Sequence, residues 1–260
     1  MRTGKLLSIG LISLGLALAQ PPAPKPAAKK PVAAKSYKEL KYPPLNEIKV
    51  PEPVRFELSN GMVVYLVEDH ELPTITVSAM IRTGARLAPA GKTGLASITG
   101  SVMRTGGTAT LPGDKLDEEL DRLGAFVETG IGEDSGRAQV SVLNEDIDRG
   151  LTILADILQN PALPQDKIDL AKIQQRDQIA RRNDNPNSIA FREFNRIIMG
   201  KDSPYGRIAE YDTINSIARQ DLIAFHREYF QPENVILGAW GDFSAAEMRA
   251  KIDKTLGAWK

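Results

Sequence analysis

The sequence predicts an α+β domain in which a mostly antiparallel sheet packs against helices. Two observations indicate this class. Short apolar segments with the alternation of strands occur in both halves of the chain, and longer segments with helical spacing of apolar residues lie between them. The two kinds of segment do not alternate strictly, as they would in a parallel βαβ fold. The composition, 42% hydrophobic and 25% charged over 260 residues, is typical of a folded globular protein.

Residues 1–19 are predicted to be a secretory signal peptide. Arg2 and Lys5 form a charged start, and the apolar run that follows ends in the small-x-small triplet Ala17-Leu18-Ala19. This is the pattern of a cleavable export signal, and the run is short for a membrane span. An uncleaved anchor helix is the alternative. We expect an exported protein, periplasmic or extracellular, with no stable membrane span after cleavage.

Residues 20–53 are predicted to be a linker followed by a surface strap. Residues 20–35 are rich in Pro, Ala and Lys and offer almost nothing to bury, so they should stay extended. The proline-marked residues 42–53 are expected to cross the surface of the domain. The folded domain is then residues 54–260.

Charge and cysteine content restrict the function. Six of the 33 basic residues lie in the first 35 residues, which contain no acidic residue, so the remaining 225 residues carry a net charge of −6. That balance gives no reason to expect nucleic-acid binding, which requires a basic face. The chain has no cysteine, so neither disulfides nor thiolate metal ligands are available.

Four strands are predicted in the first half of the domain. The apolar, β-branched residues 62–67 and 75–82 are expected to pair with each other as antiparallel strands. Residues 126–129 and 137–143 alternate between apolar and polar side chains, as half-buried strands do.

Two helices are predicted between these pairs of strands. In residues 93–105 the apolar side chains recur three and four positions apart, which indicates one buried helical face. Residues 114–123 show the same spacing, and Asp114 follows a Pro-Gly pair, so it can cap the first turn.

The second half is predicted to be mainly helical, with prolines marking several of the joints. Helices are expected over residues 147–158, 165–183, 188–199, 220–229 and 245–256. Before the last helix, the apolar residues 235–240 predict a buried strand, and Trp240 is expected in the core. Trp259 is expected to pack on a domain outside this sequence.

Five motifs in the same order resemble the M16 family of pitrilysin, insulinase and processing peptidases. They are LSNGM at 58–62, GLA at 94–96 followed by Met103 and by GGT at 106–108, LADIL-x-NP at 154–161, SPYGR at 203–207, and YF-x-P-x-N leading to GDF at 229–243. The resemblance covers about residues 54–260. It implies the αβ domain of these metallopeptidases, in which a zinc ion is bound on the helix that carries the second motif.

The residues that would bind zinc in this family are replaced here. The family motif H-x-x-E-H places two histidine ligands on one helical face and a general base beside the second, and a later glutamate completes the ligand set. The histidine positions are Ser97 and Ser101, the base position is Gly100, and the later glutamate falls on Gln178. Hydroxyl and amide groups are poor zinc ligands, and glycine offers no base. We therefore predict no catalytic residue and no zinc.

Two other kinds of site were weighed and judged weaker. A zinc site shared by His70 and His226, the only histidines, would join a loop to a helix about 150 residues later. A serine nucleophile at Ser97 or Ser101 would need a base, and Lys92 is the only lysine nearby. We favour small residues that pack the helix. Gly100 inside it suggests either that tertiary packing holds the helix or that another backbone approaches closely there.

Peptide binding is the activity that survives loss of zinc. In the family, substrate adds a strand to an exposed sheet edge, and the matching positions are Ala125, Phe126, Val127, Glu128 and Thr129. A strand covered by its neighbour is the alternative. The nearby acids, which include Glu133 and Asp134, would favour basic peptides.

The resemblance therefore predicts a non-catalytic M16 homologue. Family members enclose peptides between at least two such domains, so the expected partner is a zinc-bearing M16 peptidase subunit or a second M16 domain, and the chain is expected to be the pseudo-peptidase subunit of the peptide chamber. One alternative is a structural or peptide-binding module of the cell envelope without a peptidase partner. The other is a metallopeptidase with an atypical site.

Overall fold

The computed structural model describes residues 36–40, 42–45 and 50–260. The predicted signal peptide and the linker over 20–35 lie outside these residues. The strap expected over 42–53 is described only in part, and it stays a prediction. Residues 50–260 form one compact unit that contains the whole sheet. No helix in the described part of the chain is long and apolar enough to cross a membrane.

Six strands form a single sheet in the order β1-β2-β6-β3-β5-β4. Only β2 and β6 run parallel, and the other four neighbouring pairs are antiparallel. The predicted α+β class is confirmed. The strands are β1 (Val54–Glu57), β2 (Val63–Glu68), β3 (Thr74–Ile81), β4 (Phe126–Ile131), β5 (Gly136–Leu143) and β6 (Val235–Gly241).

The expected pairing of β2 with β3 is wrong, because β6 lies between them. Ala239 of β6 is opposite Leu66 on one side and Val77 on the other. The central position suits a strand without charged residues whose inward side chains, such as Val235 and Leu237, are buried. Local alternation reveals the strands themselves, but it does not reveal a partner from the other end of the chain.

Eight α-helices follow or separate the strands within residues 50–260. They are α1 (Leu95–Thr105), α2 (Gly113–Leu123), α3 (Ile147–Gln159), α4 (Gln165–Arg181), α5 (Pro186–Met199), α6 (Tyr211–Ser216), α7 (Arg219–Tyr229) and α8 (Ala245–Leu256). The short helix α6 was not predicted. Asp114 is not the cap of α2, because the helix begins at Gly113; its carboxylate lies in the first turn and pairs with Lys167 at 3.1 Å.

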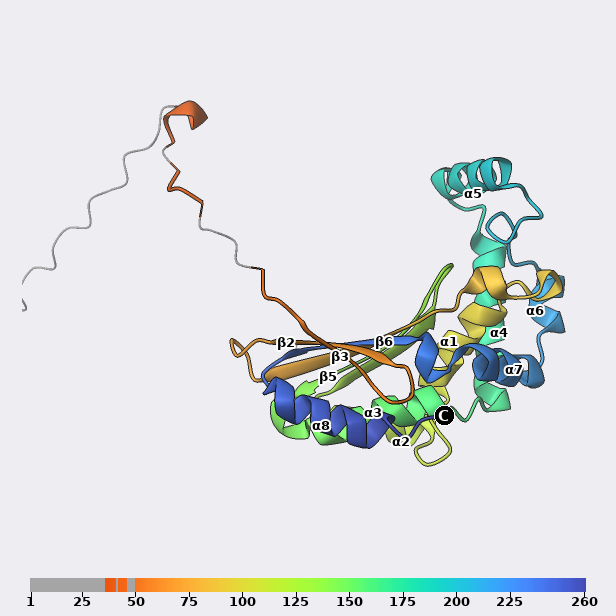
Figure 1. Ribbon diagram of the computed structural model, residues 1–260. Helices are drawn as coiled ribbons and strands as arrows, with labels where there is room; N and C mark the ends of the chain where they lie inside the picture. Colours follow the sequence, from red (N-terminus) through yellow and green to blue (C-terminus); the bar gives the residue numbers. More distant parts are fainter. Residues whose placement is uncertain (1–35, 41, 46–49) are drawn as a thin grey trace, which may run out of the picture. The chain divides into compact units, whose positions relative to one another are not determined.

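The helices cover one face of the sheet. Figure 1 shows α3 and α8 side by side beneath the strands, and both contact the sheet. Inward side chains such as Val77 and Ala79 are fully buried against this layer. Trp240 corrects the sequence prediction: it is 41% exposed, because it alternates with the buried Ala239 and points to the opposite face. Trp259 is buried within the domain itself.

Candidate functional site

The candidate site lies where α1 crosses the outer strand β4. Leu95, Ile98, Val102 and Met103 hold α1 in the core, because all four are buried. Gly100 lies at the crossing. A Cβ atom at this position would lie 2.5 Å from the backbone nitrogen of Ile131 and 2.8 Å from the carbonyl carbon of Gly130. The backbone approach expected from a glycine inside a helix is confirmed.

Two side chains fasten α1 to β4. The hydroxyl of Thr129 donates to the carbonyl oxygen of Gly100 at 2.5 Å. Arg104 donates through Nε to the carbonyl oxygen of Val127 at 2.7 Å, and its guanidinium pairs with Asp117 at 2.8 Å. The junction is therefore held by backbone contact and hydrogen bonds.

The side chains at the positions predicted to correspond to the family's metal ligands are neutral. Ser97 is exposed and its Oγ accepts a hydrogen bond from Nε2 of Gln175 at 3.3 Å, whereas Ser101 is half-buried. Gln178 lies one helical turn beyond Gln175 on α4 and is exposed. The structure thus brings Gln175 to Ser97, a contact that spacing along α4 could have suggested, because residues three apart share a helical face.

This set of donors does not fit zinc. Zinc sites in proteins use imidazole, thiolate or carboxylate ligands, and the groups here are hydroxyls and an amide. Within residues 36–40, 42–45 and 50–260, no group of three or more His, Cys, Asp or Glu side chains could hold a metal ion. A zinc-dependent step cannot be built from these residues.

The two histidines have separate surroundings. His70, in the loop after β2, is exposed, and Nδ1 lies 2.6 Å from a carboxylate oxygen of Asp242, a hydrogen bond that raises the pKa of the imidazole. His226, on α7, is buried, and burial lowers its pKa although Nε2 is hydrogen-bonded to the carbonyl of Leu158 at 2.9 Å. Its ring stacks on Phe230. Each histidine is engaged in its own local contact.

A serine nucleophile also lacks its base. The ammonium of Lys92 is paired with Asp221 and donates to the carbonyl of Ser216 at 3.2 Å. The group that reaches the hydroxyl of Ser97 is the amide of Gln175, which cannot take up its proton. The arrangement is that of a packed and hydrogen-bonded helix.

Strand β4 is the outermost strand of the sheet in the described residues, and it pairs only with β5. It begins at Phe126, as the strand pattern predicted, so Ala125 of the expected peptide-binding positions lies before it. Ala125 instead donates its N–H to the carbonyl of Leu120 and closes the end of α2. The N–H of Gly132 donates to the carbonyl oxygen of Ser135 at 2.9 Å. Counting back from Gly132, every second residue of β4 therefore bonds to β5, and the residues between them point their backbone groups away from β5. The backbone groups of residues 127, 129 and 131 therefore face the free edge.

A shallow concavity of about 590 Å³ lies on the helix-free face of β4 and β5. Phe126, Glu128 and Gln139 are among the residues that line it. Beyond it, at the hairpin tip, Asp134 pairs with Arg86 at 3.0 Å, so its charge is already balanced. Of the three acids expected to favour basic peptides, Glu128 is the one that lines this concavity.

At the same hairpin tip, burial raises the pKa of Glu133, and the neighbouring Asp134 raises it further. The hydroxyl of Tyr205 donates to Asp134 at 2.9 Å and joins the tip to the loop before α6. This end of β4 is thus held in place from the helical side.

Comparison with known proteins places these features in a family. The family model described as insulinase, peptidase family M16, matches residues 63–209, and the model described as the peptidase M16 inactive domain matches residues 216–260. An uncharacterized zinc protease of Rickettsia bellii (strain RML369-C) is 25% identical over 200 residues, which are 76% of this chain and 48% of that protein. The chain therefore spans about half the length of this relative.

Solved structures share the fold. A peptidase M16 inactive domain from Pseudomonas fluorescens superposes with a TM-score of 0.73 at 22% identity, over 78% of this chain and 50% of the other. The periplasmic protease PqqL from Escherichia coli superposes with a TM-score of 0.71 at 18% identity, over 81% of this chain and 24% of the other.

Proposed function

The chain belongs to peptidase family M16, the insulinase family, and from that membership we propose that it is a non-catalytic homologue that binds peptides as a subunit. Its expected companion is a zinc-bearing M16 peptidase, with which it forms a peptide-binding chamber. This chain contributes an edge strand and a chamber wall, and the companion contributes the zinc chemistry.

The observation that carries this proposal is the junction of α1 with β4. The position that holds the general base in the family's motif is Gly100, and a Cβ atom there would lie 2.5 Å from the backbone nitrogen of Ile131. Any side chain at this position requires the strand or the helix to move. Ser97, Ser101 and Gln175 around it offer no anionic ligand. Both the backbone packing and the side chains therefore support the proposal that the chain is non-catalytic.

The free edge of β4 supports peptide binding. An extended peptide gains affinity from main-chain hydrogen bonds to an edge strand, and this requires no metal. Arg104 already occupies the carbonyl of Val127, and Gly100 lies against the backbone nitrogen of Ile131, so the bonding groups left for a peptide are those of Thr129. The concavity beside the strand, with Glu128 in its lining, gives room for alternate side chains of the peptide.

The proposed location of the protein rests on its N-terminal sequence and on a similar structure. The charged and apolar start of the sequence favours export, and the similar structure of PqqL is described as that of a periplasmic protease. We therefore assign the chain to the periplasm or the extracellular space, together with its companion.

The test combines metal content, cleavage and binding on the purified exported chain. After dialysis against trace zinc, we expect elemental analysis to give a zinc ratio near zero, and mass spectrometry to show a basic, unstructured peptide left intact. Fluorescence anisotropy should show that the same peptide binds. About one zinc per chain together with cleavage would overturn the proposal in favour of an atypical metallopeptidase.

A matched pair of variants tests the binding mode. Thr129→Pro removes the edge-facing N–H and should weaken peptide binding roughly tenfold, the value of about one hydrogen bond that is lost without replacement. Thr129→Val also loses the hydroxyl bond to Gly100 but keeps the N–H, so it should bind as the wild type does. Equal binding by both variants would exclude strand addition at this edge.

A further inference from the structure

Helix α5 presents its apolar side to solvent. Phe191, Phe194, Ile197 and Ile198 are 71%, 60%, 79% and 61% exposed, and none of the residues of α5 is buried. Phe194 is three residues from both Phe191 and Ile197 and four from Ile198, which places the four side chains on one broad face of the helix. We call these four side chains the α5 stripe. Contiguous exposed apolar surface of this kind marks an interaction site in a soluble protein.

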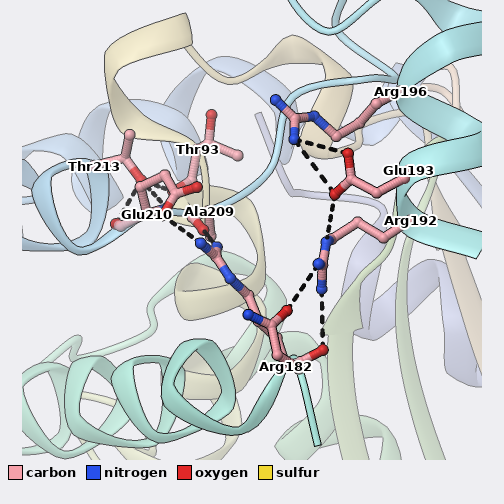
Figure 2. Close-up of polar contacts among 9 residues, drawn as sticks. Thr93, Arg182, Arg192, Glu193, Arg196, Ala209, Glu210 and Thr213 are labelled. Carbon is pink, nitrogen blue, oxygen red and sulfur yellow. Dashed lines mark hydrogen bonds and ion pairs between the residues drawn. The ribbon is translucent and has the colours of Figure 1, made fainter. Parts of the chain in front are cut away.

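The charged side of the same helix faces the protein. Arg192 donates to the carbonyl oxygen of Arg182 at 3.0 Å and to the side chain of Asn183 at 2.9 Å. Glu193 lies between Arg192 and Arg196, with 3.2 Å to a guanidinium nitrogen of each. Figure 2 shows Arg192 reaching Arg182 at the end of α4, with Glu193 between Arg192 and Arg196. The helix is therefore turned the opposite way from an ordinary surface helix.

Further contacts hold this orientation. The guanidinium of Arg182 pairs with Glu210 at 2.9 Å and donates to the carbonyl oxygen of Ala209 at 3.1 Å. The backbone N–H of Glu210 in turn donates to the hydroxyl of Thr213 at 3.0 Å (Figure 2). A roll of α5 that buried the stripe would break the contacts of Arg192 with the carbonyl of Arg182 and the side chain of Asn183, whereas the Arg196–Glu193 pair lies within the helix. The outward stripe is thus a consequence of specific contacts.

The companion chain is the occupant that fits the stripe. Helix α5 lies inside residues 63–209, which match the M16 family model, so it belongs to the shared fold. The relative from Rickettsia and the structure from Pseudomonas that share this region are about twice as long as their match to this chain, which leaves room for a further domain. Within residues 50–260, nothing covers the stripe.

We propose that the α5 stripe packs against an M16 domain of the companion chain. The inference rests on the proposed function, because it names the surface through which the companion binds. Phe194 lies near the middle of the stripe and is the expected anchor, since aromatic side chains at the centre of an interface dominate its affinity.

A photo-crosslinking experiment identifies the occupant. Benzoylphenylalanine at position 194, in the full chain exported by its own cell, should form an adduct whose peptides, sequenced by mass spectrometry, come from an M16 protein. Leu170, an apolar residue of α4 that is 48% exposed, gives the control position, which should yield no such adduct. An adduct with lipid, with a second copy or with the N-terminal residues of this chain, or no adduct at all, would overturn the proposal.

A binding measurement separates this inference from the proposed function. Phe194→Glu should weaken association with the crosslinked M16 protein roughly thirtyfold, while the melting temperature stays unchanged because the side chain is exposed. Equal affinity of wild type and variant would exclude the α5 stripe as the interface, but it would not contradict the proposed function. Absence of any M16 companion from the purified wild type would remove both.

Discussion

Helices α1 and α5 show opposite relations between sequence and surroundings. Both have apolar residues at helical spacing, yet Ile98 of α1 is 1% exposed and Ile198 of α5 is 61% exposed. Helix α1 meets β4 so closely that only glycine fits at position 100, whereas α5 turns its charged side inward. Figure 1 shows α1 against the strands and α5 beyond α4, away from the sheet.

The difference separates a packed region from an open one. Around α1, the positions predicted to correspond to the family's zinc ligands and base carry small or neutral residues, and Gly100 among them is closed by packing. Around α5, the four side chains of the stripe are apolar although they are exposed. This contrast is the basis of the proposed subunit role, and the following changes test it.

The largest difference is expected between two alanine substitutions. Ile98→Ala should lower the free energy of unfolding by about 2–5 kcal/mol, because it leaves a cavity in the core. Ile198→Ala on the isolated chain should change it by no more than about 0.5 kcal/mol, because the side chain is exposed. Urea unfolding of both variants measures this. Similar losses would mean that α5 is buried in solution, and the contrast between the helices would fail.

A smaller effect is expected at the crossing of α1 and β4. Gly100→Ala should lower the free energy of unfolding by about 2 kcal/mol, because overpacking costs about 3 kcal/mol and alanine returns about 1 kcal/mol of helix propensity. Gly130→Ala is the control on the facing strand, where a Cβ atom meets no other atom within 4 Å. It should stay within about 0.5 kcal/mol of the wild type. Equal melting temperatures for the two variants would show that the junction is looser than described.

The smallest expected effect is the pH dependence of stability that comes from His226, in the packed region behind α1. Burial lowers the pKa of His226 below its ordinary value of 6.5, so the unfolded chain takes up this proton at a higher pH than the folded chain. The contribution of His226 to stability is therefore fully present above pH 6.5 and falls as the pH decreases toward its folded pKa.

The variant His226→Gln isolates this contribution. Its amide can keep a hydrogen bond to Leu158, but it does not titrate. Thermal melts from pH 7.5 to 5.5 should show the wild type losing stability relative to the variant. The raised pKa of His70 acts in the opposite direction and is present in both proteins, so it cancels in the difference. A constant difference across this range would show that His226 is solvated in solution.

Local pattern was enough to predict most of the secondary structure and the close approach at Gly100. A glycine inside a helix with a buried face has few explanations, and a close approach by another backbone was one of the two considered. The side to which α5 turns could not be predicted, because periodicity identifies a stripe but not what it faces. Trp240 was misplaced for a related reason: alternation in β6 gives two faces, and only the tertiary structure shows which is covered.

The ligand positions show a similar limit. Alignment by motif placed the later glutamate on Gln178, and the structure brings Gln175 to Ser97, one helical turn away. The register of α4 against α1 depends on packing between helices, which the spacing of motifs does not determine. The predicted pairing of β2 with β3 was wrong because the strand that lies between them, β6, begins about 170 residues after β2.

The position of β6 also has a consequence for biosynthesis. Strands β2 and β3 emerge from the ribosome early, but the strand that joins them begins only at Val235. Until then, both present unpaired edges, which are sites for aggregation. The sheet closes through contacts between distant parts of the chain, and such contacts form slowly. A growing chain therefore remains unfinished and in need of protection until nearly all of this sequence has been made.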